Sequence, residues 1–155
     1  MAGIGVVIRN SSGQVIGALL DRIHLPSVVD DVEAIACRRA ISFAMEIGVE
    51  EVVFEGDSET IIKALNSDSS CLSSFGHVVE DIRALALNFA SRCFSHVKGQ
   101  GNAVADKLAK LAKYSPVMSK NLVAIDRSFC WIIKTIVLFS KKKKNEKKKE
   151  EDNLH

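Results

Sequence analysis

The sequence lacks several features that would assign it to large classes of protein. It has four cysteines but no CxxC pair, so a zinc site is not expected. Their wide separation indicates free thiols in a reducing, intracellular compartment, with nuclear and cytoplasmic locations both open. The apolar segment 129–139 is interrupted by Lys134 and falls short of the roughly 20 residues that span a bilayer. The first ten residues indicate a strand and not a signal peptide.

Excess positive charge is also missing from the main part of the chain. The formal net charge is +2, but the segment 141–155 holds seven lysines and four acids, so it carries +3 and the segment 1–140 carries −1. Any nucleic-acid binding by the segment 1–140 would therefore depend on geometry and metal ions more than on bulk electrostatics. The Lys/Glu-rich segment 141–155 is expected to be disordered. It is typical of a nuclear-targeting or nucleic-acid-binding tail, or of an extension without a selected function.

What the sequence does contain, from residue 2 to about residue 113, is an alternation of short strands and amphipathic helices. The pattern predicts strands at 2–10, 15–23, 50–55 and 92–98, and helices at 30–47, 58–65, 74–89 and 102–113. Asp30 or Asp31 is expected to cap the first helix and Gly48 to stop it, and Ser58 is expected to cap the second helix. The order β-β-α-β-α-α-β-α predicts an α/β fold with a mixed sheet. In the first strand Gly3 and Gly5 leave one face thin, which indicates a closely packed neighbour.

Three segments follow from this pattern. Residues 1–114 form the predicted domain, residues 115–140 are a poorly patterned apolar extension, and residues 141–155 are the charged tail. Trp131 and its apolar neighbours are interpreted as a peripheral packing segment. No element is predicted within residues 115–140.

Three acidic residues occur where predicted elements begin or end. Glu33 opens an alanine-rich helix, Asp57 ends the strand at 50–55, and Asp106 lies in the first turn of the last helix. Each alone could serve as a helix cap or interact with a helix dipole. Together they indicate the remnant of a metal site, because converging carboxylates hold divalent cations that cut phosphodiester bonds.

Four stretches, in order, resemble those of one family: residues 3–10, 32–36, 54–58 and 96–109. The chain resembles the plant ribonuclease H-like domains of the type 1 ribonuclease H family, which also occur in retrotransposon-derived proteins. The resemblance implies a mixed sheet with helices on both faces and hydrolysis of the RNA strand of RNA–DNA hybrids. It implies that Glu33, Asp57 and Asp106 are catalytic and bind Mg²⁺ or Mn²⁺. It also implies nucleic-acid contacts by four further residues: Ser58, Lys98, Gln100 and Asn102.

The chain departs from this family at its N-terminus, because it starts at what would be the second strand. The family's first strand lies between the second and fourth strands and carries an aspartate that bridges two metal ions. Without it we expect weak binding of one metal ion and little or no cleavage. The second and fourth strands could close a gap of about 4.8 Å and pair directly. Otherwise two apolar edges would stay open and invite aggregation or strand donation from another chain.

The leading interpretation is a ribonuclease H-like nucleic-acid domain with weakened or lost activity. The alternatives are a non-catalytic nucleic-acid-binding or protein-interaction module, and a retroelement remnant. The missing strand suggests a truncated fragment of a longer protein or a gene model that lacks an upstream exon. Neither a small-molecule cofactor nor a membrane is expected as a partner.

Overall fold

The computed structural model describes residues 1–24, 26–114, 119–123 and 135–141, and it confirms the predicted order of elements through residue 114. The elements are β1 (Ala2–Arg9), β2 (Val15–Ile23), α1 (Val29–Glu46), β3 (Glu51–Gly56), α2 (Glu59–Asn66), α3 (Gly76–Ala86), β4 (Ser91–His96), α4 (Ala103–Tyr114), β5 (Ser119–Val123) and β6 (Thr135–Lys141). The tail predicted to be disordered began at Lys141, but this residue ends β6 because it pairs with Ile4 of β1. The rest of that tail, residues 142–155, lies outside the described residues.

The two ends of α1 differ in how well the sequence predicted them. The N-cap is Val28, which makes no side-chain hydrogen bond, so the prediction of Asp30 or Asp31 as cap is wrong. Both aspartates lie in the first turn instead, where negative charge interacts favourably with the helix dipole. The predicted stop at Gly48 is confirmed, since this glycine has a φ of 80°, which suits a residue without a Cβ.

Helix α3 is shorter than the predicted 74–89. It begins at Gly76, where an added Cβ would lie 1.9 Å from the carbonyl oxygen of Cys71, so the preceding loop packs directly on the helix start. It ends at Ala86, and the backbone N–H of Ala90 already donates to the carbonyl of Glu50. The chain therefore leaves the helix early in order to bring β4 alongside β3.

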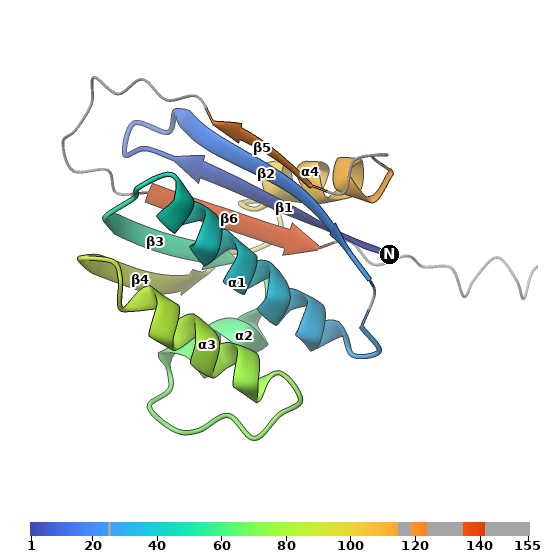
Figure 1. Cartoon of the computed structure of the whole chain (residues 1–155), viewed down its shortest axis with the longest axis vertical. Coiled ribbons are helices and arrows are strands. Elements are labelled where there is room, and N and C mark those ends of the chain that lie inside the picture. Colours follow the sequence, from blue (N-terminus) through green and yellow to red (C-terminus); the bar gives the residue numbers. More distant parts are fainter. Residues whose placement is uncertain (25, 115–118, 124–134, 142–155) are drawn as a thin grey trace, which may run out of the picture.

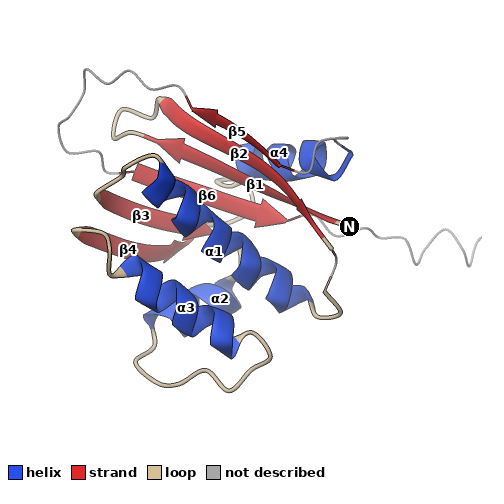
Figure 2. Ribbon diagram, viewed as in Figure 1, coloured by secondary structure: helices blue, strands red, loops and turns tan. Residues whose placement is uncertain are grey.

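The sheet has six strands in the described part of the chain, in the order β4-β3-β6-β1-β2-β5. Strand β6 lies between β1 and β3, antiparallel to β1 and parallel to β3. Neither sequence-based alternative therefore occurs, because β1 and β3 do not pair directly and their facing edges are not open. Residues 115–140, for which no element was predicted, contribute β5 and most of β6 (Figure 2).

Helices cover both faces of the sheet. Helices α1 and α3 lie side by side on one face, and α4 lies against the other (Figure 1). The predicted close neighbour of Gly3 and Gly5 is α4: a Cβ on these glycines would lie 1.9 Å from the Ala109 carbonyl oxygen and 2.1 Å from that of Ala105. The α4 backbone therefore rests directly on β1.

The hydrophobic core lies between α1 and the sheet. Ile4, Val6 and Ile8 point to this side of β1 and are fully buried. Phe43 of α1 and Phe54 of β3 are also fully buried in the same cluster. The period-2 alternation of β1 thus separates a core face from the glycine face that receives α4.

A candidate nucleic-acid and metal site at one edge of the sheet

Strand directions bring the ends of several elements together at one edge of the sheet. This edge is formed by the ends of strands and not by an outer strand. Because β3 and β6 are parallel, their carboxyl ends meet there, and the pairing of Ile4 with Lys141 brings the start of β1 to the same edge. Strand β2 ends beside the start of β1, where Ala2 pairs with Ile23, and α1 begins a few residues later. We call this the acidic edge, defined by Glu33, Asp57 and Asp106.

Glu33 belongs to α1 and faces inward, with only 4% of its surface exposed. A carboxylate at such depth requires compensation by polar or charged groups. Cys37 lies one turn further along the same face and is fully buried. Burial raises the pKa of the Cys37 thiol, and the nearby Glu33 carboxylate raises it further.

Asp57 directly follows β3, so it lies where the carboxyl ends of the parallel strands β3 and β6 meet. Ser58, the next residue, is the N-cap of α2, and its hydroxyl accepts a hydrogen bond of 3.4 Å from the backbone N–H of Ile61. The predicted cap is confirmed. The nucleic-acid contact implied for Ser58 stays a prediction.

Asp106 is carried by α4 on the opposite face of the sheet from Glu33. Its carboxylate lies 3.4 Å from the ammonium of Lys110, one turn later on the same helix. The neighbouring Ala105 rests on Gly5 of β1, which fixes this turn of α4 near the acidic edge.

The loop between β4 and α4 holds the other residues implied in nucleic-acid binding. Lys98 and Gln100 lie in this loop, and the backbone N–H of Gly101 donates to the carbonyl of Lys98 at 2.8 Å across a tight turn. Asn102 is fully buried, and the nucleic-acid contact implied for it stays a prediction. Its carbonyl accepts the first helical hydrogen bond of α4, from the N–H of Asp106.

The three acids do not form a compact metal-binding cluster. Among the described residues, no group of three or more His, Cys, Asp or Glu side chains is arranged to hold a metal ion. Oxygen-rich donors suited to Mg²⁺ are thus present at the acidic edge but are not gathered into a ready-made site. The assignment of Glu33, Asp57 and Asp106 as metal ligands stays a prediction.

Sequence reasoning missed the residues that β6 brings to this edge. Gly56 pairs with Phe139, and Asp57 and Ser140 are the residues that follow this pair in their two segments; Ser140 itself pairs with Gly5, and Lys141 pairs with Ile4. The only sequence signal was the β-branched run at residues 135–137. It was hard to recognise because it lies far from its partners in the chain.

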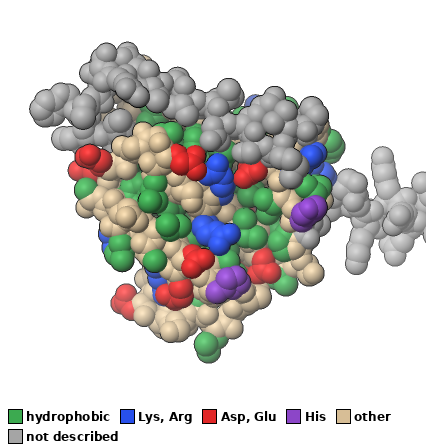
Figure 3. All heavy atoms as spheres, in the orientation of Figure 1, with side chains coloured by type: hydrophobic (Ala, Val, Ile, Leu, Met, Phe, Trp, Pro, Cys, Tyr) green, Lys and Arg blue, Asp and Glu red, His purple; other side chains and the backbone are tan. Residues whose placement is uncertain are grey.

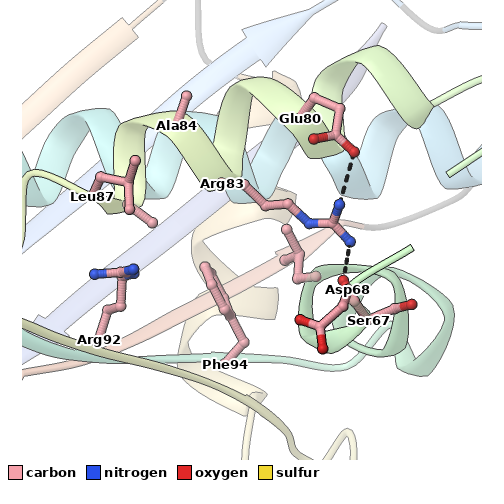
Figure 4. A pocket seen from close by; sticks show the side chains of 10 residues that line it. Ser67, Asp68, Glu80, Arg83, Ala84, Leu87, Arg92 and Phe94 are labelled. Atoms are coloured by element: carbon pink, nitrogen blue, oxygen red, sulfur yellow. Dashed lines mark hydrogen bonds and ion pairs between the residues drawn. The ribbon is translucent and has the colours of Figure 1, made fainter. Parts of the chain in front are cut away.

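A separate hollow of about 440 Å³ lies between α2, α3 and β4 (Figure 4). The guanidinium of Arg83 donates to the Glu80 carboxylate at 2.7 Å and to backbone carbonyls of the loop after α2, among them that of Ser67. Through these hydrogen bonds the Arg83 guanidinium holds the loop in place. None of the predicted site residues lines this hollow, so it is distinct from the acidic edge.

The surface in the view of Figure 3 mixes acidic and basic side chains, consistent with the small net charge of the main part of the chain. Within the described residues, no helix combines the length and apolar character needed to cross a membrane.

Comparison with known proteins agrees with this architecture. The RNase H1 of the halophilic archaeon Halobacterium salinarum NRC-1 superposes with a TM-score of 0.66 at 23% identity, covering 71% of this chain and 83% of that one. The N-terminal RNase H domain of Rv2228c from Mycobacterium tuberculosis, solved as a fusion with maltose-binding protein, gives a TM-score of 0.51 at 16% identity. That match covers 72% of this chain and 91% of the other. No curated protein sequence matches the chain significantly.

The mixed sheet with helices on both faces and the two structural matches define a ribonuclease H-like fold, as the sequence predicted. Residues 1–112 match the reverse transcriptase-like family, and the chain belongs to that family.

Proposed function

We propose that this chain is a ribonuclease H-like domain that binds RNA–DNA hybrids and cleaves them weakly or not at all. The proposal depends on one observation: the strand between β1 and β3 ends in Ser140 and Lys141, so it adds no carboxylate beside Asp57. The hybrid would be recognised through its shape, phosphates and 2′-hydroxyls.

The metal part of the proposal is weak binding of one Mg²⁺ or Mn²⁺ by Glu33, Asp57 and Asp106. It is supported by the nature of these donors and by their origin at one edge of the sheet. The absence of a ready-made cluster among the described residues favours weak binding over tight binding. A single weakly held cation would provide little of the charge stabilisation that phosphodiester cleavage needs.

The test compares hybrid binding with hybrid cleavage by the purified chain in Mg²⁺ and in Mn²⁺. We expect saturable binding of the hybrid and little turnover. Asp57→Asn should weaken Mn²⁺ binding measured by calorimetry, whereas Asp81→Asn, which changes an exposed acid of α3, should not. Robust cleavage by the unmodified chain that Asp57→Asn abolishes would contradict the proposed loss of activity.

A gain-of-function variant tests the role assigned to β6. Ser140→Asp would add a carboxylate next to Asp57, and Ser140→Asn is the control of matched size. We expect about tenfold tighter Mn²⁺ binding for the aspartate variant alone, equivalent to about 1.4 kcal/mol. Equal affinities for the two variants would show that position 140 does not face the metal ligands.

A further inference from the structure

The sheet contains a strand that enters from a distant part of the sequence. Strand β6 follows all the other described elements in the chain, yet it pairs on both sides, with β1 over Ile4–Arg9 and with β3 over Val52–Gly56. Of the other strand pairs, β1–β2 and β3–β4 join strands that are closer together in the sequence, and β2–β5 lies at the outer side of the sheet. The central position of β6 therefore needs a separate explanation.

The two halves of the sheet are built without β6. Strands β1 and β2 form a hairpin on which α4 rests through Gly3 and Gly5. Strands β3 and β4 pair with each other, and α2 contacts β4. Helix α1 links the halves, because it contacts β1, α2 and α3 as well as β6. Residues 2–114 thus supply both walls of a gap between β1 and β3.

The gap has the dimensions and chemistry of a site for one extended peptide. Two strand spacings of about 4.8 Å separate β1 from β3, which leaves room for a single strand. Both walls offer backbone N–H and C=O groups, and these would be unsatisfied inside the domain if the gap were empty. Helix α1 closes one side and α4 closes the other, since both contact β6.

The connection to β6 is long enough to let this strand enter and leave. Val123 of β5 pairs with Gly17, which pairs with Ile8, which in turn pairs with Val137. Val123 and Val137 are therefore about three spacings, or roughly 14 Å, apart across the sheet, and β6 begins two residues before Val137. The segment 124–134 joins β5 to β6 and could extend to roughly 40 Å, at about 3.6 Å for each residue, so the connection does not force β6 into place.

We propose that the gap between β1 and β3 is a peptide-binding site, and that residues 135–141 are its built-in ligand. The ligand is an extended apolar segment held by main-chain hydrogen bonds on both sides, as when one protein donates a strand to complete the sheet of another. The segment belongs to the same molecule as the site. Site and ligand are therefore separable parts joined by residues 124–134.

The first test cuts the connection in the full chain. A specific protease sequence is placed within residues 124–134, and the protein is cleaved after folding. We expect the C-terminal fragment to co-elute with the domain in gel filtration and to separate in urea. A fluorescent synthetic peptide of residues 133–142 should then exchange into the cut protein saturably, and a scrambled peptide should not. Separate elution of the fragment with an unchanged melting temperature of the domain would overturn the proposal.

The second test disables the built-in ligand without a cut. Val137 pairs with both Ile8 and Phe54, and Val137→Pro removes a backbone donor and disrupts the strand. This variant should bind the added peptide at least about tenfold more tightly than the unmodified chain, because its own segment no longer competes. Asn145→Pro, the same substitution beyond β6, is the control. Equal peptide affinities for the two variants would overturn the proposal.

Two further outcomes are decisive. If Val137→Pro does not fold alone, refolding in the presence of the peptide should restore its circular dichroism and melting transition, and failure to do so counts against the site. Light scattering of the unmodified chain should give a monomer. A stable dimer in which labelled and unlabelled copies exchange β6 would overturn the assignment of the ligand to the same molecule.

Discussion

At the scale of single residues, contact between α4 and the sheet depends on two glycines in β1. A Cβ on Gly5 would lie 2.1 Å from the Ala105 carbonyl oxygen and 2.5 Å from the Ala109 nitrogen, and both are backbone atoms of α4. Backbone cannot move aside as a flexible side chain can. The two glycines therefore set how closely the helix that carries Asp106 approaches the acidic edge.

Gly5→Ala should destabilise the domain by at least about 2 kcal/mol, because α4 must shift away from β1. Urea denaturation measures the change. Gly99→Ala is the matched control, since a Cβ there meets no atom within 4 Å, and it should change stability by less than about 0.5 kcal/mol. Similar losses for both variants would mean that the helix contact is not the cause.

The buried thiol of Cys37 makes stability depend on pH in the alkaline range. Its pKa is raised above the ordinary value of 9.0 in the folded state, so the folded protein keeps a proton that the unfolded chain loses. Stability from this group is complete below pH 9.0 and should decline by about 1.4 kcal/mol per pH unit above it. Cys37→Ala should remove this part of the slope.

The same burial predicts the order in which thiols react. In a Cys130→Ser background at pH 8, a disulfide reagent should modify the exposed Cys93 quickly and Cys37 only on unfolding. Fast modification of Cys37 in the native protein would contradict its burial. Mass spectrometry of tryptic peptides distinguishes the sites.

At the scale of elements, Arg83 fastens α3 to the loop that follows α2. Its guanidinium donates to the carbonyls of Ala64 at 2.6 Å and Ser69 at 3.2 Å, to the carbonyl of Ser67, and to the Glu80 carboxylate. One side chain thus satisfies several backbone acceptors that the end of α2 leaves open. The loop has a defined path because of this single residue.

Arg83→Met should cost about 2–3 kcal/mol, because hydrogen bonds from a charged donor are removed and several acceptors are left without it. Arg38→Met is the control: Arg38 forms an exposed pair with Asp81 at 3.2 Å, which should contribute less than about 1 kcal/mol. Limited proteolysis should also cut residues 67–72 faster in the Arg83 variant alone. Equal effects of the two substitutions would contradict the fastening role.

The sequence was sufficient to predict most of the helices and strands, but not all of them. Strands β1 to β4 and helices α1 to α4 have local signals, such as the Ser58 cap and the stop at Gly48, so their existence was predictable. The predicted N-cap of α1 was wrong because a local preference for Asp at a cap was overridden by the path of the loop. Strand β6 was not predictable, because both of its partners lie far away in the sequence and only tertiary contact selects it.

For the candidate site, the sequence predicted only where its acidic residues lie relative to the elements. Glu33, Asp57 and Asp106 lie near the ends of α1, β3 and α4, as expected, and their role as metal ligands stays a prediction. That Ser140 and Lys141 reach the acidic edge could not be predicted without knowing that β6 lies between β1 and β3. A site made by non-local pairing is invisible to any local pattern.

At the scale of the whole molecule, positive charge is concentrated in the tail. The segment 141–155 carries +3 and the segment 1–140 carries −1, so salt-dependent binding of nucleic acid should come mainly from the tail. Replacing the lysines beyond β6 with glutamine should lower hybrid affinity and flatten its salt dependence, by about 0.9 in slope for each phosphate that is no longer neutralised. These lysines are Lys142, Lys143, Lys144, Lys147, Lys148 and Lys149.

The control replaces Glu146, Glu150 and Glu151 with glutamine, which should raise affinity instead. Fluorescence anisotropy at several salt concentrations gives both values. An unchanged salt slope after removal of the lysines would show that the tail is a passive extension and that binding depends on the folded domain.

The late position of β6 in the chain has a consequence during synthesis. Ribosomes add roughly 5–20 residues per second, and β3 ends at Gly56 whereas β6 begins at Thr135, so several seconds pass before the nascent domain can close. During that interval, the sides of β1 and β3 that later pair with β6 are exposed to other extended chains in the cell. A molecular chaperone that recognises extended apolar segments would therefore bind the newly made chain and release it once β6 has been translated and has paired with β1 and β3.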